Sequence, residues 1–425
     1  MFENGLFNWQ LPPEIDSGHP PIFGMYLAAF WKLFGPGLPV SHIAMLPFLF
    51  GIIYYVYQLG KFLLDADKAI LLLVLIFVDA CFMGQAFLMS PDVVLLFFMF
   101  QLLYAIFTEK KGLKVVAATF LGLISMRGMM VLVGLVLFDF LKSWNIKSAF
   151  KQIKDYLVYI PPFVSILFFL LIHYLNTGWV GYHQESEWAN AFKFVSGKDL
   201  LRNLGVYVWR LLDFGRIAIW IGIFYCFTEV PDFRKDENLL QLILLTALLD
   251  LIISPVLIVY KGLLAHRYLL PLMLCGSLLF WYLLMTIKIT GKKKSYILFM
   301  VCSVLLFGNV WVYPKTIAQG WDSTLAHFPY YSLRKKMIAH IDQMGLDKKQ
   351  IGTVFPNIGP LKNFDPAMSE AGFAEADLNT QDYIFYSNVF NDFTDNEIAA
   401  LESDWLVEKT YRAFTVEVVL YKRKQ

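Results

Sequence analysis

Acidic and basic residues that could catalyse a group transfer stand in short motifs beside long apolar runs. The first motif is Asp16-Ser17-Gly18-His19-Pro20-Pro21, which precedes the apolar segment 22–34. The two prolines favour an extended backbone, so we expect Asp16 and His19 to be held at the start of that segment. A carboxylate in this position could act as a general base toward an acceptor hydroxyl. The same residues also fit a rigid, solvated loop, and residue chemistry alone favours that simpler interpretation.

Two further motifs place a charged residue at the end of an apolar run. In Ser90-Pro91-Asp92, the serine and proline are typical of a helix start, so any catalytic role of Asp92 would be additional. Met126-Arg127-Gly128 separates two short apolar runs, where an arginine needs a partner or a water-lined break in the helix. Arg127 matches phosphate geometry. An ion pair with Asp79 or Asp92 is an equally good interpretation.

Arginine recurs at two later motifs. Arg210, Asp213 and Arg216 stand at a spacing of three, which predicts one helix face. An ion-pair ladder is the favoured interpretation, and an anion contact by the arginine that Asp213 leaves unneutralised is the alternative. His266-Arg267-Tyr268 opens another apolar run. Arg267 could meet a lipid phosphate at headgroup depth with Tyr268 as an interfacial anchor, or extend to water beside an ordinary aromatic-belt residue.

The sequence gives little support for a metal site or for a disulfide bond. All four cysteines lie in apolar runs, which excludes a disulfide-stapled polar tail, and no Cys/His spacing typical of a metal site occurs. His183, Glu185 and Glu187 alternate in a polar loop and could hold a divalent metal, but a solvated loop explains them better. The sequence therefore indicates no certain cofactor, and a divalent metal is possible but unsupported. A net charge of +2 gives no reason to expect nucleic acid as a partner.

The elements that carry these motifs are apolar segments of membrane-spanning length. Of the 425 residues, 58% are hydrophobic and 16% are charged, whereas a soluble chain carries roughly 25% charged residues. A membrane helix needs about 20 mostly apolar residues. Spans are expected near residues 40–60, 70–88, 92–107, 113–125, 129–141, 156–175, 206–227, 239–259, 268–287 and 296–313. Segment 22–34 is too short to span and is interpreted as an interfacial helix ending at Gly35. Asp250 lies in mid-span without an evident partner.

The distribution of Lys and Arg between the turns predicts how these segments are oriented across the membrane. The turns near 61–68, 110–114, 142–154, 234–235 and 288–294 are rich in Lys and Arg, which marks the cytoplasmic side. The N-terminal loop and the tail then both face outward. We expect residues 1–313 to form a multi-span membrane domain and residues 314–425 a small extracytoplasmic α/β domain. Its predicted elements are a polar helix at 335–344 and strands at 351–355, 383–387 and 414–421.

The motifs and their order resemble glycosyltransferase family 39, the protein O-mannosyltransferases and lipid A aminoarabinose transferases, which have the GT-C membrane fold. The resemblance covers residues 10 to about 315. It rests on Asp16 to Ile22, Leu33-Phe34-Gly35, Ser90-Pro91-Asp92, the segment 121–128 and Arg267-Tyr268-Leu269-Leu270-Pro271. It implies an inverting sugar transfer from a polyprenyl phosphate at an outward-facing site, with arginines holding the lipid phosphate.

The sequence departs from that family at two points. Members have a first spanning helix and then an acidic pair ahead of the His-Pro-Pro segment, and neither is found in these 425 residues. Where members usually have Thr-Lys-Gly, this chain has Met126-Arg127-Gly128, which keeps the positive charge. A gene model truncated at an internal methionine would explain the missing helix and acidic pair, and an inactive truncated form is the alternative to an active transferase.

Motifs and resemblance together predict a polytopic α-helical membrane protein with a GT-C-like fold. We expect a hexosyl or pentosyl transferase of the cytoplasmic (inner) membrane that serves protein glycosylation or the cell envelope. Its partners would be membrane lipid, a polyprenyl-phosphate sugar donor and a lipid, glycan or protein acceptor. The candidate catalytic residues are Asp16, His19 and Asp92. The candidates for binding the lipid phosphate are Arg127, Arg267, Tyr268 and Arg210.

Two other classes of protein fit parts of the pattern. Charged residues within spans also occur in a transporter or flippase for a lipid-linked or anionic substrate. The sequence shows no repeated half, which many transporters have, and its polar motifs gather on one side of the membrane instead of the midplane. A non-catalytic membrane scaffold is the third interpretation, since it fits the truncated start.

Overall fold

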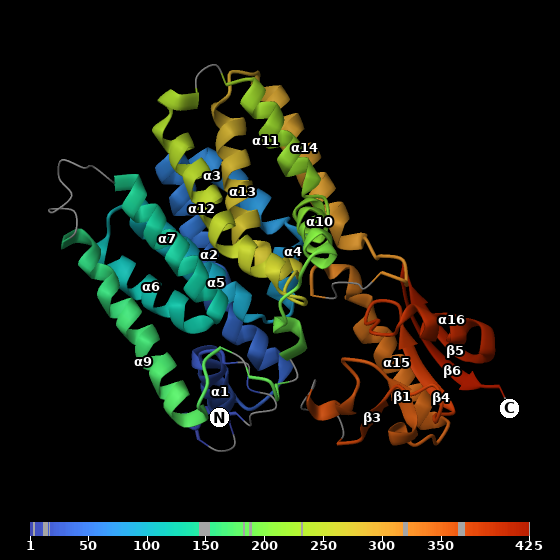
Figure 1. Cartoon of the computed structure of the whole chain (residues 1–425). Coiled ribbons are helices and arrows are strands. Elements are labelled where there is room, and N and C mark those ends of the chain that lie inside the picture. The colour runs from blue at the N-terminus through green and yellow to red at the C-terminus, as the bar shows by residue number, and fades with distance from the viewer. Residues whose placement is uncertain are drawn as a thin grey trace.

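The structure is a computed structural model that describes most of the chain. The described residues are 1–2, 5–11, 16, 18–143, 154–181, 183–186, 189–230, 233–317, 322–363 and 370–424. Helices dominate up to residue 310, and a sheet with two flanking helices follows (Figure 1). Glu187 of the polar loop, and Lys147 and Lys151 of one basic turn, lie outside the described residues.

Each predicted span contains at least one helix. In chain order these helices are α2 (Leu38–Leu63), α3 (Ala66–Phe77), α4 (Ala80–Phe87), α5 (Pro91–Phe107), α6 (Lys111–Ile124), α7 (Met126–Ser143), α9 (Ile160–Thr177), α10 (Lys198–Leu212), α11 (Ile217–Thr228), α12 (Glu237–Val259), α13 (His266–Thr286) and α14 (Gly291–Phe307). Within the described ranges, five helices are long and apolar enough to cross a membrane, or up to seven if each of two bent pairs is one span. Helices α5 and α6, with 17 and 14 residues, are shorter than the about 20 that a straight crossing needs.

The predicted interfacial segment is the helix α1 (Ile22–Phe34), which ends at Gly35 with a positive φ of 85°. Two side-chain hydrogen bonds attach α1 to α2. The Tyr26 hydroxyl donates to the carbonyl of Ala44 at 2.7 Å, and Trp31 Nε1 donates to Ser41 Oγ at 2.9 Å. This attachment fixes the position of the preceding loop, which carries His19.

Two predicted spans are broken helices. The axes of α3 and α4 differ by 70°, and Asp79 starts α4 by accepting a hydrogen bond from Phe82 N at 2.9 Å. The axes of α10 and α11 differ by 80°. At that break Phe214 and Gly215 have φ values of 49° and 87°, which no helix contains. The span predicted near 206–227 is therefore a bent pair of helices, and the prediction that Arg210, Asp213 and Arg216 share one helix face is wrong.

Helices α5 and α13 form the centre of the helical part. Both are buried along nearly their whole length, as expected for helices that are apolar on every side. Helix α5 contacts α2, α6, α7 and α13, whereas α13 also contacts α3, α11 and α12. The first turns of α5 and α13, which carry Asp92 and Arg267, are consequently enclosed by neighbouring helices.

The tail forms a six-stranded sheet in the order β2-β3-β1-β4-β6-β5. Its elements are α15 (Pro329–Gln343), β1 (Ile351–Thr353), β2 (Gly359–Pro360), β3 (Gly372–Glu375), β4 (Tyr383–Ser387), α16 (Asp395–Asp404), β5 (Trp405–Ala413) and β6 (Val416–Arg423). Strand β1 is parallel to β3 and β4, and β6 is antiparallel to β4 and β5. Neighbouring residues of β4 face opposite sides: Phe385 packs with α15, and Ile384 packs with α16.

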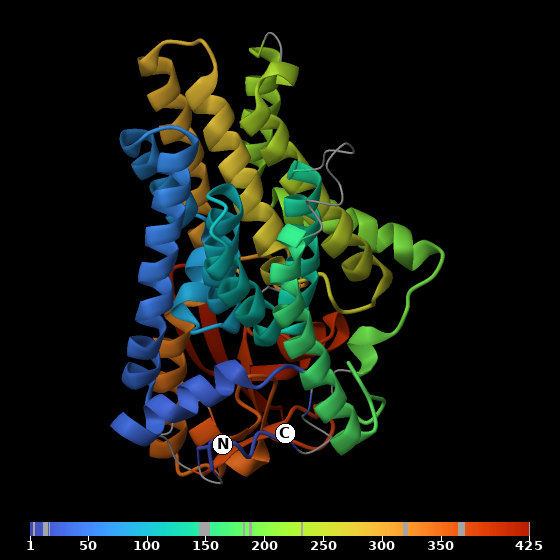
Figure 2. The same cartoon turned by 90° about the vertical axis from the view of Figure 1, so that its left-hand side faces the viewer.

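The tail lies at the same end of the helical part as the N-terminus. The connection between α13 and α14 lies at the opposite end (Figures 1 and 2), and Lys292 to Lys294 follow it in the first turn of α14. The three predicted strands correspond to β1, β4 and β6, and the predicted polar helix to α15. Helix α15 begins earlier than expected because Pro329 occupies its first turn.

Candidate functional site

Asp92 and Arg127 meet where α5 and α7 begin. Ser90 Oγ accepts a hydrogen bond from Asp92 N at 3.1 Å, so Ser90 caps α5 as its sequence predicts. Ser125 has an extended backbone between α6 and α7, which lets α7 restart beside α5. Arg127 Nη1 then lies 2.5 Å from Asp92 Oδ1. Of the two partners proposed for Arg127, the structure selects Asp92.

Arg127 and Arg267 approach each other around the ring of Tyr268. Arg127 Cζ lies 4.2 Å from the Tyr268 ring centroid, and its Nη1 donates to the carbonyl of Arg267 at 3.2 Å. Arg267 Cζ lies 5.1 Å from the same ring centroid. The exposed fraction of the side chain is 18% for Arg127 and 32% for Arg267, so neither side chain is fully buried. Two partly exposed arginines in contact with one ring could hold a single anion.

His19 joins these residues at the start of α7. Its Nδ1 accepts a hydrogen bond from Met126 N at 3.3 Å, which leaves the ring proton on Nε2. His19 as a whole residue is exposed to solvent, although neighbouring protein atoms surround its ring on most sides. Loss of bulk water, and then the charge of Arg127, lower the His19 pKa from 6.5 to about 4. His19 is therefore neutral at pH 7 and adds no positive charge to the arginines.

The Asp16 carboxylate makes its polar contacts on the other side of the same loop. Its Oδ2 lies 3.2 Å from Nε2 of His173 in α9, and its Oδ1 accepts a hydrogen bond from Gly18 N at 2.8 Å. Gly18 has a φ of 67°, and a Cβ there would lie 2.1 Å from the carbonyl oxygen of Gly181. These contacts hold the loop against the chain that follows α9. They place the Asp16 carboxylate at His173 and not at the arginines.

Arg210 and Arg216 do not share a helix face, because the α10–α11 break separates them. Arg210 Nη1 lies 3.7 Å from Asp213 Oδ2, so part of the predicted ladder exists. Arg216 is fully buried and instead pairs with Asp79, with 2.5 Å between Nη2 and Oδ1. Arg210 adjoins His266, at 3.5 Å between Nη1 and Nε2, and is not in the contacts around Tyr268.

The sequence did not predict that Asp322 would lie beside these residues. Its Oδ2 lies 3.0 Å from Arg267 Nε, and its carboxylate is buried. It falls just after the last predicted span, in a stretch with no periodicity, where nothing distinguishes it from a solvated acid. Each of the two arginines around Tyr268 thus has one buried carboxylate partner, Asp92 for Arg127 and Asp322 for Arg267.

Two other polar features of the sequence have structural explanations. Asp250 accepts hydrogen bonds from Tyr207 and Ser254, so its mid-span charge is not isolated. His183 Nδ1 accepts from Glu185 N at 3.2 Å. In the part of the chain that the structure describes, no group of three His, Cys, Asp or Glu residues could hold a metal ion.

An apolar cavity of about 420 Å³ lies beside the His19 loop, between the N-terminal segment, α1, α6 and α9. Its lining includes Trp9, Pro20, Pro21, Leu123 and Phe169. Pro20 follows His19 directly, so this cavity and the polar contacts around Tyr268 are next to each other along the chain. A hydrocarbon chain is the kind of group that such a lining would accept.

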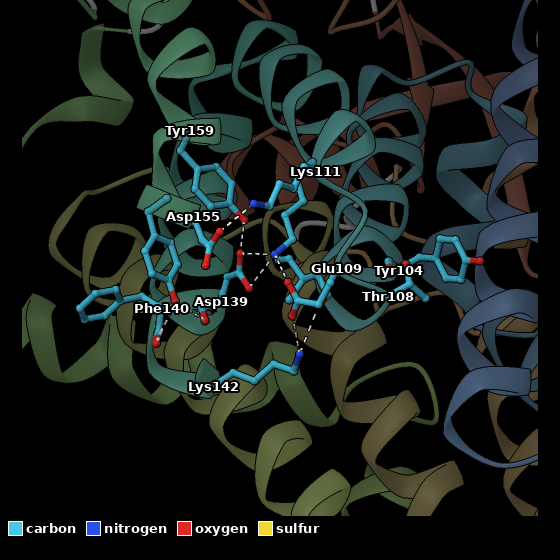
Figure 3. A network of polar contacts seen from close by, with 12 residues as sticks. Tyr104, Thr108, Glu109, Lys111, Asp139, Phe140, Lys142, Asp155 and Tyr159 are labelled. Carbon is cyan, nitrogen blue, oxygen red and sulfur yellow. Dashed lines mark hydrogen bonds and ion pairs between the residues drawn. The ribbon is translucent and has the colours of Figure 1, made fainter. Parts of the chain in front are cut away.

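A second polar network lies at the C-terminal end of α7, opposite the end that carries Arg127 (Figure 3). Lys114 Nζ lies 2.8 Å from Asp139 Oδ2 and 2.9 Å from Glu109 Oε2, and the Tyr159 hydroxyl donates to Asp139 at 2.6 Å. Lys111 pairs with Asp155 at 2.7 Å on the surface nearby. The buried lysine and aspartate neutralise each other, so this network fastens α6, α7 and the start of α9 together.

Comparison with known proteins identifies a shared fold. No family model and no curated protein matches the sequence. ArnT from Cupriavidus metallidurans bound to undecaprenyl phosphate is similar, with a TM-score of 0.51 at 12% identity, over 95% of this chain and 88% of that one. ArnT in the apo state gives a TM-score of 0.54 at 12% identity, over 99% and 91% of the two chains. The chain is therefore a polytopic membrane protein with an ArnT-like GT-C fold and a small C-terminal sheet domain.

Proposed function

We propose that this protein is a membrane glycosyltransferase that moves a sugar from a polyprenyl-phosphate donor to an acceptor. The observation that carries the proposal is the pair Arg127 and Arg267, two partly exposed arginines held around the ring of Tyr268. A transporter would need a site reachable from both sides of the membrane, whereas these residues lie at the first turns of α5, α7 and α13.

The chemistry assigned to the arginines is stabilisation of the departing phosphate. When the acceptor displaces the sugar at its anomeric carbon, negative charge grows on the phosphate oxygen. Cations already held in place stabilise that charge without reorganisation, and a phosphate leaving group needs no proton. In this proposal Asp92 orients Arg127, and Asp16 fixes the loop through His173.

The apolar cavity beside His19 is proposed to take part of a lipid chain. Its lining is aromatic and aliphatic, and a polyprenyl chain is a hydrocarbon. The undecaprenyl phosphate bound to the structurally similar ArnT supports a donor of this class.

We further propose that the site faces away from the cytoplasm. The connection between α13 and α14 lies at the end opposite both termini (Figure 2), and the first turn of α14 carries three lysines, which mark the cytoplasmic side. Residues 1–313 would then be the membrane domain of a cytoplasmic-membrane protein, and residues 314–425 its extracytoplasmic domain.

Equilibrium binding of undecaprenyl phosphate to the purified chain in detergent tests the phosphate site. Loss of one charge-assisted hydrogen bond costs about 1.5–3 kcal/mol, so Arg127→Ala and Arg267→Ala should each weaken binding roughly tenfold to a hundredfold. Uncharged undecaprenol should show no such dependence. Arg202→Ala is the matched control, because Arg202 is an exposed arginine on α10 paired only with Asp199.

Transfer of a labelled sugar from a polyprenyl-phosphate donor in proteoliposomes tests the reaction itself. The wild-type chain should deliver label to a membrane acceptor, and both arginine variants should not. Movement of the donor across the bilayer without transfer would favour a flippase, and normal binding in both well-folded arginine variants would remove the proposed site.

A further inference from the structure

The carboxylate that faces Arg267 comes from outside the helical part of the chain. Asp322 lies between α14 and α15, in the segment that leads into the tail, and pairs with Arg267 Nε at 3.0 Å. Arg267 lies in the first turn of α13, 55 residues earlier (322 − 267). The contacts around Tyr268 are thus completed by a residue of the segment that leads into the tail.

The segment carrying Asp322 is fastened to the helical part through the Asp322 carbonyl and through Ser323, the residue that follows. Gln85 Nε2 in α4 donates to the Asp322 carbonyl at 2.5 Å. Ser323 Oγ lies 2.9 Å from His266 Nδ1 at the start of α13. Gly84 leaves room for the segment, since a Cβ there would lie 3.0 Å from Thr324 N. Asp322 is therefore held by contacts other than its ion pair.

His266 is itself held from the opposite side. Asp213, at the α10–α11 break, places Oδ2 2.9 Å from His266 Nε2, so Asp213, His266 and Ser323 form a continuous hydrogen-bonded chain. Ser323 has no exposed surface, and a nucleophile must be reachable by substrate. This chain consequently positions the segment and does not perform nucleophilic chemistry.

We propose that Asp322 is a positioning residue for the donor phosphate, which rests on the proposed function. Its Oδ2 forms an ion pair with the guanidinium of Arg267 on the Nε side, and Nε donates no hydrogen bond, so the attraction between the two charges is what holds the group in place. Arginine is a planar fork that binds phosphate in a defined orientation, and a freely rotating guanidinium loses that advantage. Asp92 has the same relation to Arg127, and the two carboxylates also balance the two cations when the site is empty.

Binding of undecaprenyl phosphate to the full chain in detergent separates this role from a merely structural one. Asp322→Asn keeps a polar side chain of the same size beside Arg267 but removes its charge, so binding should weaken less than in Asp322→Ala. Asp322→Ala removes both the charge and the polar group, and binding should weaken on the order of tenfold. Because Asp322 acts through Arg267, adding Asp322→Ala to Arg267→Ala should weaken binding no further. Lys315→Ala is the matched control, because it breaks an exposed ion pair with Glu402 in the same region.

Three outcomes would overturn the positioning role. Wild-type binding by a folded Asp322→Ala variant would show that Arg267 needs no such support. Tenfold tighter binding by Asp322→Asn would show that Asp322 competes with the phosphate. Equal losses in the wild-type and Arg267→Ala backgrounds would show that Asp322 acts independently. Failure of Arg267→Ala to weaken binding would instead contradict the proposed function.

Discussion

At the scale of single residues, the ion-pair partner of each charged group determines what that group does. Asp79 and Asp92 both lie near the start of a helix, yet Asp79 neutralises the fully buried Arg216, and Asp92 orients the partly open Arg127. An arginine with all its surface buried serves stability, whereas one that keeps an open edge can bind an anion. By this distinction we propose Arg127 and Arg267 as binding residues, whereas the fully buried Arg216 pairs with Asp79.

Lysine and alanine at position 267 should differ in a defined way. Lysine keeps the positive charge but loses the planar two-pronged contact, and alanine loses both. We expect Arg267→Lys to weaken undecaprenyl phosphate binding less than Arg267→Ala, in parallel measurements of Kd. Equal affinities in the two variants would mean that charge contributes nothing at this position.

His19 should remain neutral throughout the physiological pH range. Its pKa is lowered from 6.5 to about 4 because the crowded loop desolvates the imidazolium and Arg127 repels it. The unfolded chain takes up this proton near pH 6.5, so the stability that depends on His19 falls as the pH drops from 6.5 toward 4. An NMR titration with labelled histidine, assigned by loss of one signal in His19→Gln, measures the value. A midpoint near 6.5 would show that the ring is fully solvated.

At the scale of elements, breaks in helices place the functional side chains. The α10–α11 break brings Asp213 to His266, and the α6–α7 break at Ser125 brings Arg127 to Asp92. The first break depends on Gly215, which has a φ of 87° and would place a Cβ 2.3 Å from the Val304 carbonyl oxygen.

Gly215→Ala should therefore destabilise the protein. A side chain at positive φ is strained by about 1 kcal/mol, and contact with a fixed backbone oxygen adds to that cost. We expect a clear fall in Tm in detergent. Gly205→Ala is the matched control: Gly205 lies within α10, and its added Cβ would meet nothing within 4 Å. That variant should be neutral or gain roughly 0.5–1 kcal/mol. A Tm that is unchanged by Gly215→Ala would contradict the tight approach of α14.

The Lys114 network joins α6, α7 and the start of α9 through buried charges (Figure 3). Lys114→Met leaves Asp139 buried without its cation, which costs about 3–5 kcal/mol. Lys111→Met breaks an exposed pair of the same network and should cost less than about 1 kcal/mol. Thermal unfolding of the two variants side by side checks the difference, and comparable losses would show that burial does not govern this network.

At the scale of the whole molecule, both termini lie toward one end, and the connection between α13 and α14, followed by the lysines of the first turn of α14, lies at the other (Figures 1 and 2). With positive charge on the cytoplasmic side, a membrane-impermeant thiol reagent added from outside should label Glu408→Cys in β5. It should spare Lys293→Cys until the membrane is opened. The four native cysteines are buried, so their background should be low. The reverse labelling pattern would invert the proposed orientation.

The sequence by itself determined the elements whose causes are local. Apolar runs located the helices, Ser90-Pro91 predicted the start of α5, and Gly35 marked the end of α1. Strand alternation predicted β6, and the motifs carrying His19, Asp92, Arg127 and Arg267 were recognised. Run length, capping and turn propensity depend on neighbours along the chain, so one sequence is sufficient to read them.

Only the tertiary structure decided which charges meet. It paired Asp16 with His173, Arg216 with Asp79, and Arg267 with Asp322, across separations that no periodicity encodes. A bend of 80° between α10 and α11 also separates Arg210 from Arg216, which one continuous helix would have aligned. An ion pair needs two groups within about 4 Å, and that proximity arises from how buried helices such as α5 and α13 pack, not from the residues beside each charge.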